Sequence, residues 1–410
     1  MPYPYLMMTL LFASLAVLAA LDSSLASLNL LPWFNGLRWL RVHLITLGTL
    51  TELFFGLLPV LVAARARQAR PRMRWDIWLV LNAGLLTLLI AIPLVNHALI
   101  FVGGTLVFIA ALLLMKQLGE LRGPRSEAKA ANGRIFYLTG LAYLLLGIII
   151  GTGLWLGWGE ALRMSRPIEV HIHANNWGFM SLVFAGLLID LYPSFAGRPL
   201  AWPRSIRPIY WMLTMAALLL VLGPWIPSQL FTVPGIILFL IATGWLLANV
   251  IKPLIGVPGA WGPGLWHLIL SYVWIVAPVL VAPLILLEVT GFPGAGIELN
   301  APQALIYGWV LQFGYAFLPY LFARLLLADQ VARLGGTWFT VTTVNLGGVF
   351  LWASIFFAGQ AAVLHGIAYG LWAVSLIPIV ASLWRIARAG YSQMEDKGIA
   401  PAREQPSLAD

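Results

Sequence analysis

The sequence predicts an all-α polytopic membrane protein, and two observations lead to that prediction. Of the 410 residues, 61% are hydrophobic and only 10% are charged, whereas soluble domains carry about a quarter charged residues. Apolar runs of about 20 residues, enough to span a bilayer, recur twelve times. We expect spans at residues 5–27, 38–64, 75–96, 98–115, 135–158, 169–192, 208–225, 231–251, 264–288, 303–327, 338–358 and 362–386.

The basic residues predict the orientation of these spans. No Lys or Arg precedes the first run, so that run is expected to be a span and not a signal peptide. With twelve spans, 20 of the 24 Lys and Arg residues fall on one side, and the other side receives only Arg38, Arg41, Arg163 and Arg166. Because cytoplasmic loops are enriched in basic residues, we expect both termini in the cytoplasm and the chain in the cytoplasmic membrane.

This arrangement also accounts for the net charge of +9. A charge that follows the topology of the spans indicates a lipid bilayer as the partner and excludes nucleic acid. We expect a single transmembrane domain over residues 1–388 and a disordered cytoplasmic tail over residues 389–410.

The chain repeats at a constant interval. His43, His173 and Gln303 are evenly spaced, and each lies in the second span of a group of four. The sequence therefore predicts three four-helix blocks, at about residues 1–130, 131–260 and 261–388, with coincidence in a Gly- and Leu-rich chain as the alternative. The same offset relates Gly48, Gly178 and Gly308, then Gly56, Gly186 and Ala316, then Leu58, Leu188 and Leu318, and finally Pro59 and Pro319, with Ile189 between them.

The histidines are the best candidate ligands for a cofactor. Imidazole is a common ligand of haem iron, copper and zinc, and the absence of cysteine excludes thiolate sites, iron–sulfur clusters and disulfides. Of the six histidines, only His267 is expected at the cytoplasmic end of its span. The other five are candidate ligands near the outer ends, with His43, His173 and His365 preferred for a metal, alongside His97 and His171. The alternative is that each lies at the membrane interface and bonds to a loop carbonyl.

Polar residues surround His171 and His173. Two residues apart on a helix, these rings point about 200° apart, so they are expected to serve two different neighbours. Glu169 lies one turn before His173 and is expected to accept its second ring N–H. Asn175 follows His171 by one turn, and Asn176 follows His173. These groups are predicted to support the ligands, with helix capping and headgroup contact as the alternative.

Two arginines and one carboxyl group complete the candidates. Arg38 and Arg41 lie within about a turn and a half of His43, where guanidinium groups suit carboxylates such as haem propionates. Contact with lipid headgroups explains them equally well. Glu52 lies in the middle of the second span, on the face opposite His43. An ionisable group at that depth is a functional candidate, either a proton relay or a protonated carboxyl bonded to a neighbouring helix.

These features resemble the haem–copper oxidase superfamily, which includes oxidase subunit I, nitric oxide reductase and the NnrS-type membrane proteins. The resemblance rests on twelve spans in three four-helix blocks, with histidines near their outer ends. Locally, Arg166-Pro167…His173-Ala174-Asn175 and His43-Leu44-Ile45-Thr46-Leu47-Gly48 resemble the histidine-bearing helix starts of C-type oxidase catalytic subunits. The resemblance implies a pseudo-threefold fold, haem b with copper as a second candidate cofactor, and a redox, electron-transfer or nitric-oxide-related role beside a partner subunit or cytochrome.

The sequence departs from that superfamily in its histidines. It has no adjacent His-His pair, its His-x-His lies in the sixth span instead of the tenth, and Gln303 occupies the repeat position in the tenth span. We therefore expect haem or copper binding without oxygen reduction. The alternatives are a cofactor-free transporter or channel, and a structural or assembly subunit that retains the fold. A repeat of four spans keeps the orientation of successive blocks, which counts against the inverted repeats of many transporters.

Overall fold

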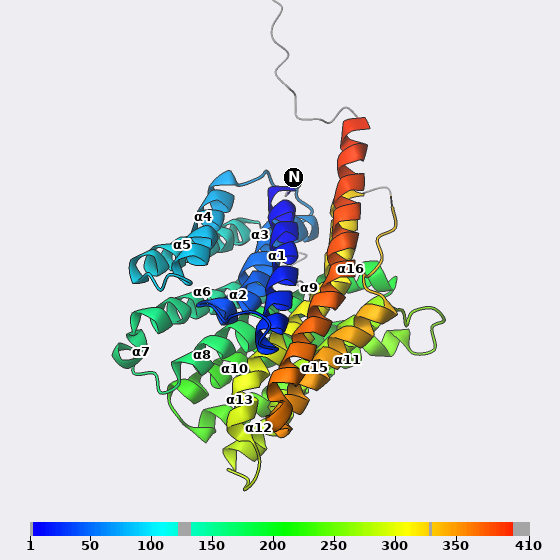
Figure 1. Cartoon of the computed structure of the whole chain (residues 1–410). Coiled ribbons are helices and arrows are strands. Elements are labelled where there is room, and N and C mark those ends of the chain that lie inside the picture. The colour runs from blue at the N-terminus through cyan, green and yellow to red at the C-terminus, as the bar shows by residue number, and fades with distance from the viewer. Residues whose placement is uncertain (1–2, 122–132, 328–329, 397–410) are drawn as a thin grey trace, which may run out of the picture.

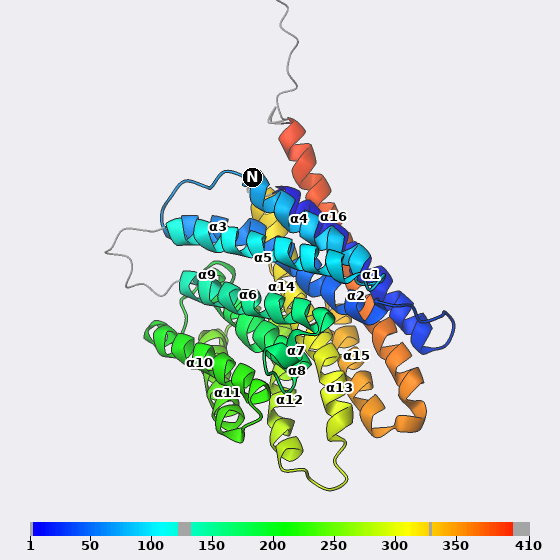
Figure 2. The ribbon, with the colours of Figure 1, turned by 90° about the vertical axis from the view of Figure 1, so that its left-hand side faces the viewer.

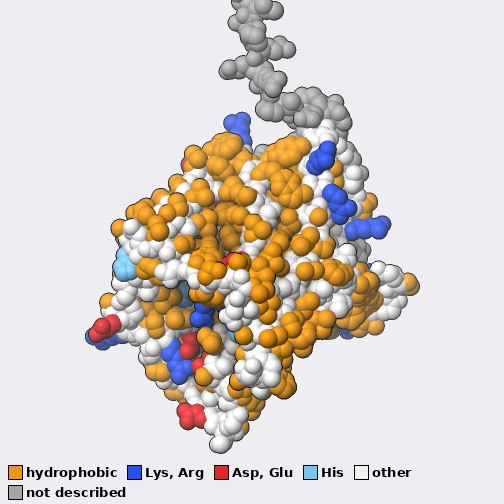
Figure 3. All heavy atoms as spheres, viewed as in Figure 1, with side chains coloured by type: hydrophobic (Ala, Val, Ile, Leu, Met, Phe, Trp, Pro, Cys, Tyr) orange, Lys and Arg blue, Asp and Glu red, His pale blue; other side chains and the backbone are white. Residues whose placement is uncertain are grey.

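The computed structural model describes residues 3–121, 133–327 and 330–396, which form helices and no strands (Figure 1). Eleven helices in these ranges are long and apolar enough to cross a membrane. Apolar side chains dominate the face seen in Figure 3, and most of its charged side chains lie toward the upper right and lower left margins. The prediction of an all-helical, multi-pass membrane protein is confirmed.

The helices follow one another with short connections. In chain order they are α1 (Tyr3–Ser27), α2 (Leu37–His43), η1 (Leu44–Leu50), α3 (Thr51–Arg65), α4 (Trp75–Ala91), α5 (His97–Glu120), α6 (Arg134–Leu156), α7 (Trp158–Ala161), α8 (Pro167–His173), η3 (Ala174–Met180), α9 (Ser181–Ala196), η4 (Pro203–Ser205), α10 (Ile206–Trp225), α11 (Gln229–Ile251), η5 (Lys252–Leu254), α12 (Pro263–Leu286), α13 (Gly294–Ala304), η6 (Leu305–Leu311), α14 (Gln312–Leu326), α15 (Trp338–Phe356), η7 (Ala358–Gln360) and α16 (Ala361–Asp396).

Two expected segments differ from the structure. The third span was expected to reach residue 96, but α4 ends at Ala91, because a turn containing Pro93 follows and Asn96 caps α5 by accepting a hydrogen bond from the Leu99 N–H. With 17 residues, α4 falls short of the eleven longer helices. The expected disordered tail was placed too early, because α16 continues to Asp396 without a proline after Pro378. Residues 397–410 of that tail lie outside the described residues.

Three of the spans form the centre of the bundle. They are α2–η1–α3, α8–η3–α9 and α13–η6–α14, whose most apolar windows are 78%, 78% and 100% buried, against at most 50% for the other spans. In each, a seven-residue π-helical segment interrupts the α-helix, starting at Leu44, Ala174 and Leu305. π-Helical turns are often found at functional sites. The step from Leu44 to Ala174 equals that from His43 to His173, and the step from Ala174 to Leu305 is one residue longer.

In each π-helical segment, an aromatic ring from the preceding span packs directly against a glycine. A Cβ atom on Gly48 would lie 2.6 Å from the ring of Phe12, one on Gly178 would lie 2.4 Å from Tyr143, and one on Gly308 would lie 2.4 Å from Trp274. These distances are shorter than real carbon contacts, so each position requires glycine. The three aromatic residues are themselves evenly spaced along the chain.

The remaining spans surround the three central ones. Each central span is followed by a packed pair of antiparallel helices, α4 with α5, α10 with α11, and α15 with α16. Helix α1 packs along α16, α5 along α6, and α11 contacts α12, so the first and last spans of the chain meet (Figure 2). The N-terminus and the C-terminal end of α16 lie at the same end of the bundle (Figure 1).

A buried carboxylate joins two of the central spans at the ends of α3 and α9. Asp190 accepts hydrogen bonds from the N–H of Gly133 at 3.0 Å and from the hydroxyl of Tyr137 at 2.8 Å. Arg65 approaches one of its oxygens at 3.2 Å and donates to its backbone carbonyl at 2.6 Å. The carboxylate is 2% exposed, whereas the arginine side chain is 45% exposed. Three donors therefore balance one charge that is hidden from water.

Replacing Asp190 with alanine is expected to destabilise the fold by about 3 kcal/mol, because it leaves the Tyr137 hydroxyl and the Gly133 N–H without their acceptor. The midpoint of thermal unfolding in detergent measures this loss. The matched control is Asp76→Ala, which breaks an exposed ion pair with Arg74 and should change stability by at most about 1 kcal/mol. Equal midpoints for the two variants would contradict the role given to Asp190.

Candidate functional site

Three histidines have one ring nitrogen tied to a backbone carbonyl. Nδ1 of His43 lies 2.8 Å from the carbonyl oxygen of Trp39, and Nδ1 of His171 lies 2.9 Å from that of Gly147. Nδ1 of His173 bonds to the carbonyl of Leu220. Because a carbonyl oxygen only accepts hydrogen bonds, each Nδ1 carries the proton, and each Nε2 presents its lone pair. Among the described residues, no group donates a hydrogen bond to any of these three Nε2 atoms.

This arrangement is the one that proteins use to prepare histidine ligands. A metal-bound imidazole usually donates its other ring N–H to a carbonyl or carboxylate, which fixes the tautomer and raises the basicity of the coordinating nitrogen. A purely structural histidine in an apolar surrounding gains most from using both nitrogens. The alternative was that each histidine lies at the membrane interface and bonds to a carbonyl. That alternative explains the hydrogen bond at Nδ1 of each ring, but it does not explain why the lone pair of Nε2 has no donor.

His171 and His173 serve different neighbours, as their separation of about 200° around the helix predicts. His171 bonds to Gly147 on α6, whereas His173 bonds to Leu220 on α10. His171 also faces His43 of α2, with ring centroids 6.3 Å apart and ring planes at 29°. The structure therefore divides the histidines into a pair, His43 and His171, and a separate site at His173.

Trp39 and Asn175 hold the rings of the pair. The indole of Trp39 stacks on His43 with centroids 4.4 Å apart and planes at 9°. The side-chain amide of Asn175 donates to the His171 carbonyl at 2.9 Å, one turn back along the helix, and lies 3.4 Å from the His171 ring. The amide thus lies in the supporting position that the sequence predicts for it.

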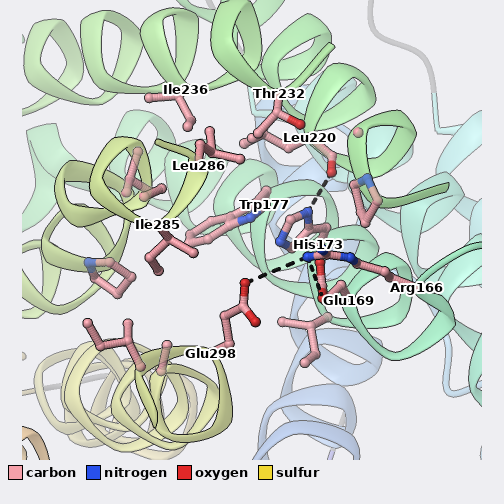
Figure 4. A pocket seen from close by; sticks show the side chains of 18 of the residues that line it. Arg166, Glu169, His173, Trp177, Leu220, Thr232, Ile236, Ile285, Leu286 and Glu298 are labelled. Carbon is pink, nitrogen blue, oxygen red and sulfur yellow. Dashed lines mark hydrogen bonds and ion pairs between the residues drawn. The ribbon is translucent and has the colours of Figure 1, made fainter. Parts of the chain in front are cut away.

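His173 lies on the wall of a cavity of about 380 Å³ between α8–η3, α10, α11, α12 and α13 (Figure 4). Its volume falls in the range of about 300–1,000 Å³ that small-molecule sites occupy. The indole of Trp177 lies next to the His173 ring, with centroids 5.9 Å apart and planes at 53°. The walls are mostly apolar and include Leu220, Ile236, Val279, Ala282, Ile285 and Leu286.

Charged side chains line one side of this cavity. Arg166 lies 3.3 Å from a carboxylate oxygen of Glu169 and 3.7 Å from one of Glu298 (Figure 4). The expected hydrogen bond from His173 to Glu169 is therefore wrong. The Nδ1 atom of His173 turns toward α10, while Glu169 is drawn to the guanidinium group three residues before it. Glu288 also lines the cavity, so its lining contains one arginine and three carboxylates.

The third repeat position is filled with side chains. Gln303 accepts a hydrogen bond from the Tyr369 hydroxyl at 3.2 Å. The guanidinium carbon of Arg41 lies 4.7 Å from the centre of the Tyr369 ring, and the backbone carbonyl of Arg41 accepts a hydrogen bond from Tyr307 at 2.6 Å. Arg41, expected beside the His43 site, is therefore buried next to Gln303 and leaves little room for a ligand there.

Other predicted site residues lie apart from these centres. His97 is exposed at the start of α5, and Arg38 is also exposed. His365 lies near the start of α16, and its buried Nε2 has no hydrogen-bond partner in the part of the chain that the structure describes. The structure does not bring it together with His43 and His173. Within the described ranges, no group of three or more His, Cys, Asp or Glu side chains is placed to hold one metal ion.

Buried polar side chains also lie deeper in the central spans. Glu52 is fully buried in α3 beside the Asn82 side chain, and among the described residues neither of its carboxylate oxygens makes a well-formed hydrogen bond. Gln312 lies two repeat intervals after Glu52 and is likewise fully buried with an unpartnered side chain. Asn176, which follows His173 by three residues, is buried inside η3. The repeat thus places two polar groups at matching depths, and the sequence pattern identified only Glu52.

Two glycines of α6 belong to the site and were missed. A Cβ atom on Gly151 would lie 2.6 Å from Cε1 of His171, and one on Gly147 would lie 2.4 Å from the Asn175 amide. Together they form a groove that seats both polar side chains. Their spacing, Gly147-Ile148-Ile149-Ile150-Gly151, is a small-xxx-small motif of close helix packing, which is the signal that could have found them.

Comparison with known proteins adds no relationship to this geometry. No protein-family model matches the chain, and no curated protein matches it.

Proposed function

We propose that this chain is an integral membrane haem-binding protein, in which His173 would hold haem b in the large cavity. The main support for the proposal is the position of His173 on the wall of a largely apolar cavity of about 380 Å³. Its Nδ1 donates a hydrogen bond to the Leu220 carbonyl, so the lone pair of Nε2 remains able to bind a metal. When bound, haem would supply one-electron chemistry or the binding of a small molecule such as nitric oxide. An external redox partner, either a subunit or a cytochrome, belongs to this proposal.

The residues around the cavity suit such a group. The Leu220 carbonyl orients the His173 ring and increases its donor strength. Val279, Ile285 and Leu286 of α12 give the cavity an apolar wall. Arg166 is 55% exposed at the margin, where it can exchange Glu298, at the longer distance of 3.7 Å, for a propionate of the ligand.

We further propose that the fold consists of three four-helix blocks related by pseudo-threefold symmetry, in the cytoplasmic membrane with both termini in the cytoplasm. The three π-helical segments, the three glycine–aromatic contacts and the three following helix pairs support this arrangement. In this arrangement, the repeat position of the first block is His43, which pairs with His171. That of the second block is His173, which lines the large cavity, and that of the third block is Gln303, which bonds to Tyr369.

The acidic margin of the cavity favours a second candidate function. The lining contains one arginine and the carboxylates of Glu169, Glu288 and Glu298, a balance that suits a cationic amphipathic substrate better than an anionic one. In that case the chain would be a cofactor-free transporter, and a dye such as ethidium would bind in the cavity in place of haem.

Titrating haem into the purified protein in detergent tests the proposal. We expect one equivalent to bind with a Soret band and a reduced-minus-oxidised difference spectrum. His173→Ala should weaken binding at least about 100-fold, because the loss of a ligand exceeds the 10–100-fold effect of losing an outer partner. His97→Ala, at an exposed position, should leave the spectrum unchanged.

A wild-type protein without a Soret band, or a His173→Ala variant with an unchanged spectrum, would reject haem binding at this cavity. Saturable binding of ethidium together with the absence of haem binding would favour the transporter instead, and Glu298→Gln should then weaken ethidium binding.

A further inference from the structure

We propose that Pro224 is a positioning residue for His173, because it leaves the Leu220 carbonyl free to accept the hydrogen bond of the imidazole ring. The bond from Nδ1 of His173 to the Leu220 carbonyl joins α8 to α10 (Figure 4). Pro224 lies inside α10, four residues after Leu220, and all three residues line the large cavity. This inference rests on the proposed function for the use that it gives to His173, but the tautomer of the ring can be measured without haem.

A proline at this position removes the donor that the Leu220 carbonyl would otherwise have. In an α-helix, the carbonyl of one residue accepts a hydrogen bond from the N–H of the residue four positions later. That residue is Pro224, whose nitrogen carries no hydrogen. A carbonyl within a membrane needs another donor, because lipid offers none. The ring N–H of His173 is that donor, so the helix and the histidine satisfy each other.

The other two histidines share their carbonyl acceptors with a helix backbone. The ring of His171 bonds to the Gly147 carbonyl, and Gly151, four residues later within α6, has a backbone N–H for the same carbonyl. The ring of His43 bonds to a carbonyl four residues earlier in its own helix, whose helical donor is the N–H of His43 itself. Among these three rings, only that of His173 bonds to a carbonyl for which no helical N–H competes.

Two further backbone bonds hold the start of α8 against the end of α10. The N–H of Arg166 donates to the Pro224 carbonyl at 3.1 Å. The N–H of Ser165 donates to the Trp225 carbonyl at 3.3 Å. Both acceptors belong to the last turn of α10, whose carbonyls have no partner within the helix. These bonds fix how the two helices lie against each other, and so they bring the His173 ring to the carbonyl that the proline leaves free.

The consequence for His173 is a single defined tautomer. Because a carbonyl oxygen only accepts hydrogen bonds, the ring proton stays on Nδ1, and Nε2 keeps its lone pair in a ring that lines the cavity. With an N–H at position 224, the helix would compete for the Leu220 carbonyl, and the tautomer with its proton on Nε2 would gain population. In that tautomer Nε2 is a donor and has no lone pair for a metal. Pro224 therefore acts on His173 through the Leu220 carbonyl.

Nitrogen-15 NMR of the purified, histidine-labelled protein without haem tests this inference, because the chemical shift of each ring nitrogen shows whether it carries a proton. The signals of His173 are those that His173→Gln removes, and in the wild type we expect its proton on Nδ1. Pro224→Ala restores a competing N–H. It should raise the ratio of the Nε2-protonated to the Nδ1-protonated form about 3-fold or more, the range expected when one hydrogen bond is weakened.

Two controls separate the missing N–H from other effects of the substitution. Pro234→Ala changes a proline inside α11 that is exposed and does not line the cavity, so the His173 ratio should stay that of the wild type. Pro224→lactate places an ester at the same position, which removes the proline ring but adds no N–H. It should also keep the wild-type ratio, because the Leu220 carbonyl remains free.

The inference fails if the wild type carries the His173 proton on Nε2, if Pro224→Ala keeps the wild-type ratio, or if the lactate variant shifts the ratio as alanine does. Haem titration of the same proteins separates the two proposals. A tautomer shift in Pro224→Ala, with no haem binding by the wild type, would reject the proposed function alone. Haem binding by the wild type, with an unchanged tautomer in Pro224→Ala, would reject this inference alone.

Discussion

Ala282→Trp is expected to abolish haem binding while leaving every histidine in place. Ala282 lies on α12 and lines the same cavity as His173. An indole at this position would take up much of the 380 Å³ and block the approach to Nε2 of the imidazole. We expect at least about a 100-fold loss of affinity, since rejecting a ligand from a filled apolar pocket costs about 3 kcal/mol or more. Haem titration followed by the Soret band measures the effect.

The matched control is Leu280→Trp on the same helix. Leu280 is 59% exposed and does not line the cavity, so its indole would face lipid, where aromatic side chains are tolerated. Haem affinity should remain that of the wild type. If the two tryptophan variants bind haem equally well, the cavity is not the binding site, and His173 would have to act elsewhere.

The central spans show how far the sequence alone predicts this fold. Their apolar runs and the even spacing of His43, His173 and Gln303 located the helices that form the centre of the bundle. The π-helical segments were not predicted, although they start directly after His43 and His173. An extra residue in a helical turn changes the backbone hydrogen bonds but leaves the apolar pattern nearly unchanged, so periodicity alone does not reveal it.

The surroundings of the histidines could be predicted only where they depend on a single helix. Helix geometry separated His171 from His173 correctly and placed Asn175 beside His171. The partners on other helices, the carbonyls of Gly147 and Leu220, carry no signal in their side chains. The expected bond from His173 to Glu169 was wrong because a local ion pair with Arg166 competes for the carboxylate. The hydrogen-bond partners of His171 and His173 therefore depend on which helices pack against α8, and the spacing of residues in the sequence does not reveal them.

The buried polar groups illustrate the same limit. The sequence identified Glu52 because a carboxyl group in an apolar run is conspicuous, but it did not show that the group lies beside Asn82 of α4 without a well-formed hydrogen bond among the described residues. Arg41 was expected beside His43, yet its guanidinium group lies over Tyr369 on α16, near the other end of the chain. Neither result follows from spacing, since the first depends on which helices pack there and the second on a contact between the first and third repeat.

Gly151→Ala is expected to displace the His171 ring and destabilise the packing of α8 on α6, without affecting the cavity at His173. The new Cβ would lie 2.6 Å from Cε1 and 2.9 Å from Nδ1 of His171, so the ring must move away from α6 and weaken its bond to the Gly147 carbonyl. The strain costs about 1–3 kcal/mol, of which the better helix propensity of alanine recovers about 1 kcal/mol. The midpoint of thermal unfolding in detergent should therefore fall, by an amount equivalent to at most about 2 kcal/mol.

Gly151→Val should lower the unfolding midpoint further, because a branched side chain adds methyl groups to the same crowded position. Gly244→Ala on α11 is the control, since its Cβ would point into open space, and its midpoint should stay within a few degrees of the wild type. Haem affinity should stay unchanged in all three variants, because His173 bonds to α10 and not to α6. A Gly151→Val protein with the unfolding midpoint of the wild type would show that the His171 ring does not pack against Gly151 of α6.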